Sequence, residues 1–154
     1  MKVHIILLLV FAVACNRTTE PVGSAMMVLQ GNHALIAYNG QSLPVKLSEL
    51  PASRAGEPSG CFAEVRAGNL QLSFTGGSGS FAYAYASKNT CTGETLATYS
   101  WGGQVILMND KLAFRSTAAD GAVRSDTASL RLIDGAIVFD QRSPQLTFAS
   151  AATP

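Results

Sequence analysis

Apolar and polar residues alternate along most of this chain after its first 25 residues. The clearest alternation lies at residues 69–75 and 81–86, where apolar side chains at every second position are separated by polar residues or alanines. Period-two alternation puts successive side chains on opposite faces of a β-strand, so that one face can pack on a core. No segment shows the 3.6-residue period of a convincing helix, so the chain is predicted to be all-β. The alternating apolar residues are Leu70, Leu72, Phe74, Phe81, Tyr83, Tyr85, Leu112, Phe114, Leu130, Leu132, Leu146 and Phe148.

Turn-forming residues divide the alternating runs into short strands. Most of these residue types supply the positive φ that tight hairpins need. The turn signals are Asn39-Gly40, Gly76-Gly77-Ser78-Gly79, Gly102-Gly103, Asn109-Asp110, Asp120-Gly121 and Asp134-Gly135. The segment 48–60, SELPASRAGEPSG, contains two prolines and two glycines and is predicted to be a loop. The predicted strands lie near 27–38, 43–47, 61–66, 69–75, 81–87, 96–101, 104–108, 111–116, 122–132 (one strand or two), 135–140 and 145–149.

Strands joined mainly by hairpins must protect the edges of their sheet from pairing with other chains. Closure into a small up-and-down antiparallel β-barrel does this most completely, and a β-sandwich is the alternative. Residues 26–150 are long enough for one such domain with its own core. The sequence therefore predicts a single β-barrel domain.

The first 15 residues, MKVHIILLLVFAVAC, have the organisation of an export signal. A short, weakly basic start precedes about nine apolar residues, too few for a membrane-spanning helix of about 20 residues. The run Ala12-Val13-Ala14-Cys15 then resembles the lipobox of bacterial lipoproteins, with Ala12 where that motif usually has leucine. The resemblance implies that residues 1–14 are a cleaved signal peptide and that Cys15 is lipidated. Ordinary cleavage after Ala14, which leaves Cys15 as a free thiol, is the alternative.

Residues 15–25 are predicted to be the lipidated N-terminus and a flexible tether, because NRTTEPVGSA is polar and small with a proline and a glycine. Stable anchoring takes more than one acyl chain, and lipoprotein N-termini carry two or three. In that family, an aspartate after the cysteine tends to retain the protein at the inner membrane. This chain has Asn16, so the resemblance implies the periplasmic side of the outer membrane.

The run from His33 to Val45, HALIAYNGQSLPV, resembles the opening of a group of bacterial lipoproteins in which an early strand ends in Asn-Gly-x-x-Leu-Pro. Those proteins are similar to small lipocalin-like barrels. The resemblance therefore implies a barrel. It carries no activity, cofactor or catalytic residue to this chain.

Charge and cysteine content narrow the classes of function. Removal of residues 1–14 takes away only Lys2 among the charged residues, which leaves ten basic and ten acidic side chains. A net charge near zero gives no electrostatic basis for binding nucleic acid. Once Cys15 is lipidated, Cys61 and Cys91 remain in an exported chain and are predicted to form a disulfide. Metal binding is the rival, but two cysteines without nearby histidines fall short of a tetrahedral set.

Catalytic chemistry is not visible in the sequence. The mature chain has one histidine, His33, and the glycine-rich run around Ser78 is not a nucleophile elbow. Glu64, beside Arg66 on a predicted strand, is the acid that we single out, and its expected role is a solvated cross-strand partner. No metal or cofactor site is predicted, and the chain is expected not to be an enzyme.

Aromatic residues on two neighbouring predicted strands are the candidate binding residues. One interpretation is a core filled with rings opposite alanines. The other is a ligand-lined interior with Tyr83, Tyr85, Tyr99 and Trp101 supplying polar handles. The predicted function is a lipid-anchored envelope module that binds a small apolar ligand or a protein partner. A protein inhibitor or envelope-assembly factor is the alternative, and a hydrolase ranks below both.

Overall fold

The computed structural model describes residues 29–51, 59–76, 78–109, 111–131 and 135–150. Every secondary-structure element in these ranges is a β-strand, which confirms the all-β prediction. The predicted signal peptide, Cys15 and the tether lie outside the described residues. The strands are β1 Gly31–Tyr38, β2 Gln41–Ser42, β3 Val45–Glu49, β4 Phe62–Thr75, β5 Ser78–Asn89, β6 Thr95–Met108, β7 Lys111–Thr117, β8 Val123–Arg131, β9 Ala136–Phe139 and β10 Leu146–Ser150.

Eight of these strands close into an antiparallel barrel. From β4 to β10 each strand pairs with the next one along the chain, and β1 completes the ring between β10 and β4. Strands β2 and β3 lie outside the ring, β2 paired with β1 and β3 paired with β4. The predicted up-and-down barrel is therefore confirmed over the sandwich.

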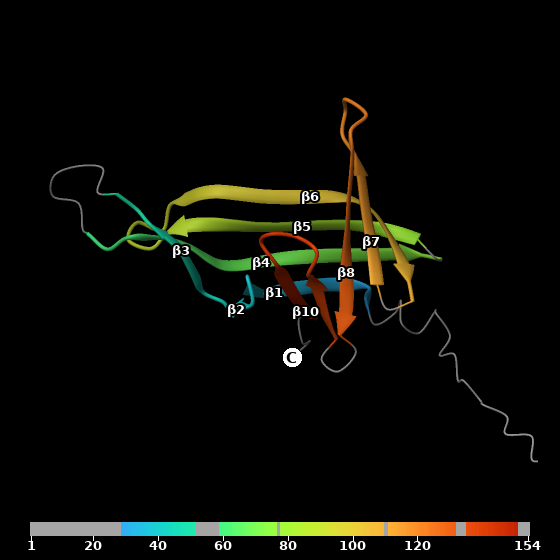
Figure 1. Cartoon of the computed structure of the whole chain (residues 1–154), viewed down its shortest axis with the longest axis horizontal. Helices are drawn as coiled ribbons and strands as arrows, with labels where there is room; N and C mark the ends of the chain where they lie inside the picture. The colour runs from blue at the N-terminus through green and yellow to red at the C-terminus, as the bar shows by residue number, and fades with distance from the viewer. Residues whose placement is uncertain (1–28, 52–58, 77, 110, 132–134, 151–154) are drawn as a thin grey trace, which may run out of the picture.

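The strands of the barrel differ greatly in length and direction. Figure 1 shows β4, β5 and β6 running side by side across the molecule with β1, while β7 and β8 cross them steeply. Strands β4 and β6 have 14 residues each and β5 has 12, whereas β9 and β10 have four and five. The three long strands therefore extend past the ring, and β3 lies at that extended end.

Two breaks that the sequence predicts inside the long strands are absent. Strand β4 runs through residues 66–68, where the register against β5 shifts between Val65 and Gly68. Strand β6 continues through Gly102-Gly103, so the predicted turn there is wrong. A Cβ at residue 103 would lie 2.3 Å from the backbone oxygen of Arg115 on β7. Gly103 thus permits a close approach of β7 to β6 instead of a reversal of the chain.

The first predicted loop also begins later than expected. The strand predicted near 43–47 is replaced by β2 at 41–42 and β3 at 45–49, so Ser48 and Glu49 belong to a strand. The turn predicted at Asn39-Gly40 is present, and both residues have positive φ, 50° and 74°. This geometry matches the hairpin turns for which Asn-Gly is favoured.

Aromatic rings fill the inside of the barrel. Phe81 on β5 lies 4.8 Å from Phe114 on β7, and Phe114 lies 4.8 Å from Phe139 on β9, measured between ring centroids. Phe139 in turn contacts Tyr83 and Phe148 at 5.8 and 5.9 Å. The long sheet and the steep strands are therefore held together by one continuous ring network, which matches the first of the two interpretations of the aromatics.

The predicted disulfide between Cys61 and Cys91 is present, with 5.5 Å between the two Cα atoms. Cys61 immediately precedes β4, and Cys91 lies in the turn between β5 and β6. Closing a loop of 30 residues reduces the conformational entropy of the unfolded chain, which adds about 3–4 kcal/mol to the free energy of unfolding. The bond therefore stabilises the end of the long sheet that extends past the barrel.

Candidate functional site: a tyrosine cluster beside an open strand edge

The four predicted binding residues form two cross-strand pairs. Tyr83 on β5 lies opposite Trp101 on β6, and Tyr85 lies opposite Tyr99. Tyr83, Tyr85 and Trp101 are 3%, 5% and 8% exposed and belong to the core, whereas Tyr99 is 47% exposed. Within this set, Tyr99 is the side chain that reaches solvent.

Trp101 ties β6 to the hairpin formed by β7 and β8. Its indole Nε1–H donates a hydrogen bond to Ser116 Oγ at 2.5 Å. The guanidinium of Arg124 lies over the indole ring, 4.4 Å from its centroid. Trp101 therefore already contacts two side chains of its own chain, and a ligand would have to displace these contacts to bind it.

Tyr83 is hydrogen-bonded to an arginine that the sequence analysis did not single out. Arg142, in the segment between β9 and β10, donates a hydrogen bond from Nη1 to the Tyr83 hydroxyl. The same guanidinium forms an ion pair with Asp126 on β8 at 3.6 Å, and both side chains are mostly buried. Its Nε has no hydrogen-bond partner among the described residues. No sequence pattern links residues 83 and 142, because only closure of the barrel brings them together.

Tyr85 lies at the centre of a tyrosine cluster that we define as Tyr38, Tyr85 and Tyr99. The rings of Tyr85 and Tyr99 stack with centroids 4.8 Å apart, and Tyr38 meets Tyr85 edge to face at 5.8 Å. Burial raises the pKa of Tyr85 to about 12 and also raises the pKa of Tyr38. Both phenols therefore stay protonated well above physiological pH, and Tyr99 is the ring through which the cluster reaches solvent.

The edge of β6 beside Tyr99 is open. Strand β6 pairs with β5 along most of its length, but β7 pairs with it only from Gln104 to Met108. In the described ranges no strand pairs with the other side of residues 95–103, although the end of β7 approaches it at Gly103. We call this stretch, TLATYSWGG, the β6 edge; it contains no charged residue and no proline. Its backbone groups are available to pair with another strand.

The residues considered for catalysis lie apart. His33 is 2% exposed, its Nε2 donates to the Leu29 carbonyl oxygen at 2.8 Å, and its Nδ1 has no partner in the described part of the chain. Glu64 pairs with Arg66 and is 6% exposed, so the expectation of a solvated side chain is wrong. His33 lies opposite Leu70, which is six residues from Glu64 along β4, a separation of about 20 Å. These two residues do not form an acid–base pair.

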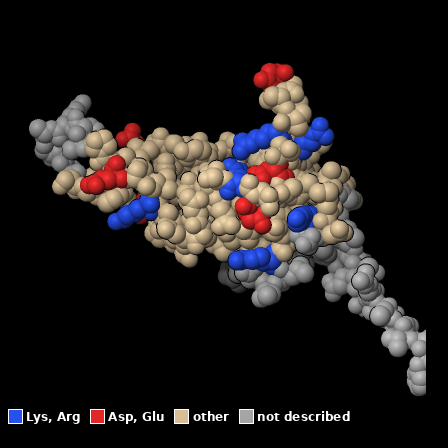
Figure 2. Space-filling model, in the orientation of Figure 1, with Lys and Arg blue, Asp and Glu red and all other residues tan. Residues whose placement is uncertain are grey.

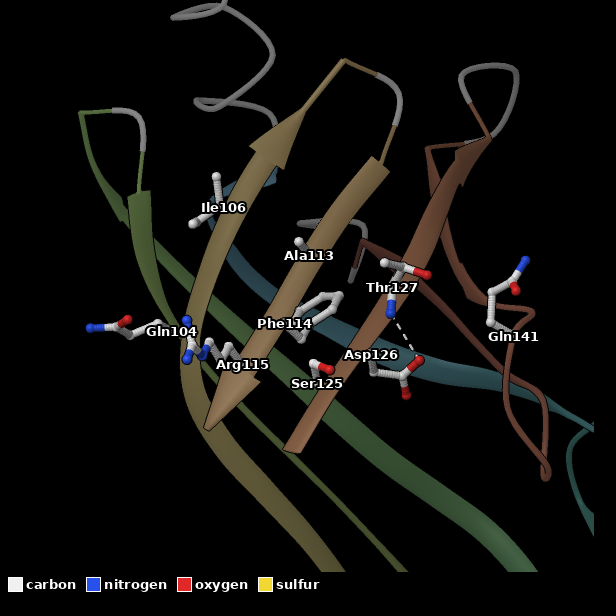
Figure 3. A pocket seen from close by; sticks show the side chains of 9 residues that line it. All are labelled: Gln104, Ile106, Ala113, Phe114, Arg115, Ser125, Asp126, Thr127 and Gln141. Atoms are coloured by element: carbon white, nitrogen blue, oxygen red, sulfur yellow. Dashed lines mark hydrogen bonds between the residues drawn. The ribbon is translucent and has the colours of Figure 1, made fainter. Parts of the chain in front are cut away.

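A shallow groove of about 500 Å³ lies over the outside of β6, β7 and β8. Figure 3 shows side chains from these three strands around it, with Gln141 set apart at one side and a hydrogen bond from the Thr127 backbone to Asp126. The groove is open, and its lining offers two charged groups. Its lining residues are Gln104, Ile106, Ala113, Phe114, Arg115, Ser125, Asp126, Thr127 and Gln141.

The remaining observations concern metal sites, membrane-spanning helices and similarity to known proteins. Within the ranges that the structure describes, no group of three or more His, Cys, Asp or Glu residues is placed to hold a metal ion. No helix in those ranges is long and apolar enough to cross a bilayer. Comparison with protein-family models, curated proteins and solved structures found no match to this chain.

Proposed function

We propose that this chain is a non-catalytic lipoprotein of the cell envelope, anchored by acyl chains on Cys15, whose barrel binds a protein partner. The observation that carries the proposal is the β6 edge, a stretch of nine residues with an unpaired side and no charge. Exposed edges of this kind bind other chains by adding a strand to the sheet. The resemblance of residues 12–15 to a lipobox supports the envelope location.

The filled interior favours a protein partner over a ligand held inside the barrel. Three of the four rings in the predicted binding set pack in the core and contact one another or neighbouring rings. A small apolar ligand remains the second candidate, because Tyr99 exposes an aromatic face that stacks on the neutral phenol of Tyr85. A ligand on that face would lie outside the core. An inhibitor or envelope-assembly role would be a form of the same protein binding.

Site-specific photo-crosslinking in intact cells tests the proposal. A photoreactive amino acid replaces Ser100, which is exposed on the β6 edge, in the full-length chain. The matched control replaces Gln71, which is also exposed but lies on β4 with β1 and β5 paired on its two sides. We expect a protein adduct from position 100 and none from position 71.

The outcomes separate the two candidate functions. Equal labelling at positions 100 and 71, or no protein adduct at position 100, would contradict binding at the β6 edge. An adduct with a small molecule instead of a protein would favour the second candidate.

A further inference from the structure

The two free edges of the extended sheet are built differently. Strand β3, at one edge, has five residues, two of which are charged, and its register shifts around Leu47. Short length, charge and bulges are the devices by which proteins keep an edge from pairing with other chains. The β6 edge has one bulge, at Leu96, and its register against β5 is then unbroken from Ala97 to Ile106.

Charge is also absent along the whole of β6, whereas β4 carries Arg66 and β5 carries Lys88. Figure 2 shows charged side chains at the end of the molecule where β3 lies and over the part where β7 and β8 cross, with other residues between the two groups. In Figure 1 the part of β6 that lies away from the β7–β8 hairpin has no strand along its outer side, in agreement with the pairing order. One edge of the sheet is therefore protected and the other is left able to pair.

We infer that the β6 edge pairs antiparallel with the β6 edge of a second copy of this chain, around a two-fold axis at Tyr99. The inference rests on the proposed binding function and names its partner. An antiparallel pair of identical strands is self-complementary, which is the requirement for a closed two-fold dimer. The axis at Tyr99 keeps the central pairing, Ala97 to Trp101, inside the unbroken part of the strand.

The side chains in this register fit one another in size and chemistry. Ala97 of one copy lies opposite Trp101 of the other, so a small side chain meets the largest one. Thr98 lies opposite Ser100, so hydroxyl groups face each other on the outer side of the sheet. Directly opposed side chains on one face are the pairs that stabilise an antiparallel ladder, and like charges are absent here.

The dimer would also cover the apolar groups that β6 leaves in solvent. Tyr99, 47% exposed, would meet its own copy across the axis and extend the stack that it forms with Tyr85. Leu96, 42% exposed, would lie near Gly102 of the second copy. The two four-stranded extensions, β3 to β6, would become one continuous sheet across the interface.

Cysteine crosslinking tests the register. Tyr99→Cys is introduced into the full-length chain, and envelope membranes are treated with a mild oxidant. We expect a covalent species of twice the chain mass, because two residues on the axis of an antiparallel pair are within disulfide reach. Thr98→Cys is the matched control, since each residue 98 lies opposite residue 100 and not opposite its own copy. Crosslinking at 98 in place of 99 would overturn the register.

Introduced charges test the pairing without a covalent bond. Thr98→Glu puts a carboxylate on the β6 edge and should raise the dimer dissociation constant at least tenfold, measured by analytical ultracentrifugation of the detergent-solubilised chain. Adding Ser100→Lys should restore dimerisation, because each introduced ammonium then lies opposite a carboxylate of the other copy. A double variant that stays as weak as the single one would contradict the pairing.

The photo-crosslink at position 100 distinguishes this inference from the proposed function. A homodimeric adduct supports both. An adduct with a different envelope protein, together with a monomeric chain in the ultracentrifuge, overturns the self-pairing and leaves the binding function standing. A monomer without any protein adduct overturns both.

Discussion

At the scale of single residues, burial separates side chains that the sequence presents as equivalent. Tyr83, Tyr85 and Tyr99 all lie on alternating runs, yet the first two are buried and the third is half exposed. The two buried hydroxyl groups have different partners: that of Tyr83 accepts a hydrogen bond from Arg142, whereas that of Tyr85 is hydrogen-bonded to Tyr38. The pKa of Tyr85 rises to about 12 chiefly because burial disfavours the charged phenolate.

The raised pKa of Tyr85 predicts a loss of stability in alkaline solution. Between pH 10 and about 12 the phenol ionises in the unfolded chain but stays protonated in the folded one. The unfolded state then binds fewer protons, so the free energy of unfolding falls as pH rises through this window. A difference of two pKa units corresponds to at most about 2–3 kcal/mol.

Tyr85→Phe should remove this part of the pH dependence while keeping the ring stack. Urea unfolding curves of the wild-type chain and the variant at pH 9 and pH 11.5 measure the effect. The wild-type chain should lose more stability than the variant between the two pH values. Identical losses would show that the phenol of Tyr85 titrates alike in the folded and unfolded states.

At the scale of elements, β6 is a strand that the sequence analysis divides and the structure keeps whole. Its 14 residues contain Gly102-Gly103, a dipeptide that is typical of turns, and the sequence analysis therefore divides it in two. In the structure Gly103 faces the backbone of β7 at the point where the two strands begin to pair. The sequence alone does not distinguish a glycine that permits close packing from a glycine that forms a turn. The position of the neighbouring strand is needed to tell them apart.

Gly103→Ala should therefore destabilise the barrel. The added methyl group would overlap the backbone of Arg115 and the side chain of Ser116, and backbone cannot move aside cheaply. Overpacking of this kind costs about 1–3 kcal/mol. Ser100→Ala, on the exposed face of the same strand, is the control and should change stability by less than about 0.5 kcal/mol. Equal unfolding free energies for the two variants would refute the close approach of β6 and β7.

At the scale of the whole molecule, the barrel and its extension have separate supports. The ring network joins the long sheet to the steep strands inside the barrel, and the Cys61–Cys91 disulfide holds the extended end. A strand edge that projects from a stable barrel keeps its shape without a partner. In a chain anchored by an N-terminal lipid, confinement to a membrane would raise the effective concentration of the β6 edge and favour pairing between copies.

The anchor itself is checked by the mass of the chain isolated from its own membranes. We expect residues 15–154 with the added mass of two or three acyl chains on Cys15. Cys15→Ala should abolish that added mass, whereas the control Cys61→Ala with Cys91→Ala should keep it and lose about 3–4 kcal/mol of stability. An unacylated chain beginning at Cys15 would instead indicate ordinary signal cleavage.

The sequence by itself predicted the strand content, an antiparallel barrel ahead of a sandwich, and the Cys61–Cys91 bond, and the structure shows all three. Alternation is a local property of each strand, and the bond was predicted on the expectation that Cys15 is lipidated. Only the tertiary structure decided that β6 is continuous, that β7 pairs with none of its first nine residues, and that Arg142 reaches Tyr83. These features depend on where β7 leaves β6 and on how residues far apart in the chain meet across the barrel. Both are set by long-range packing and not by the pattern within any one strand.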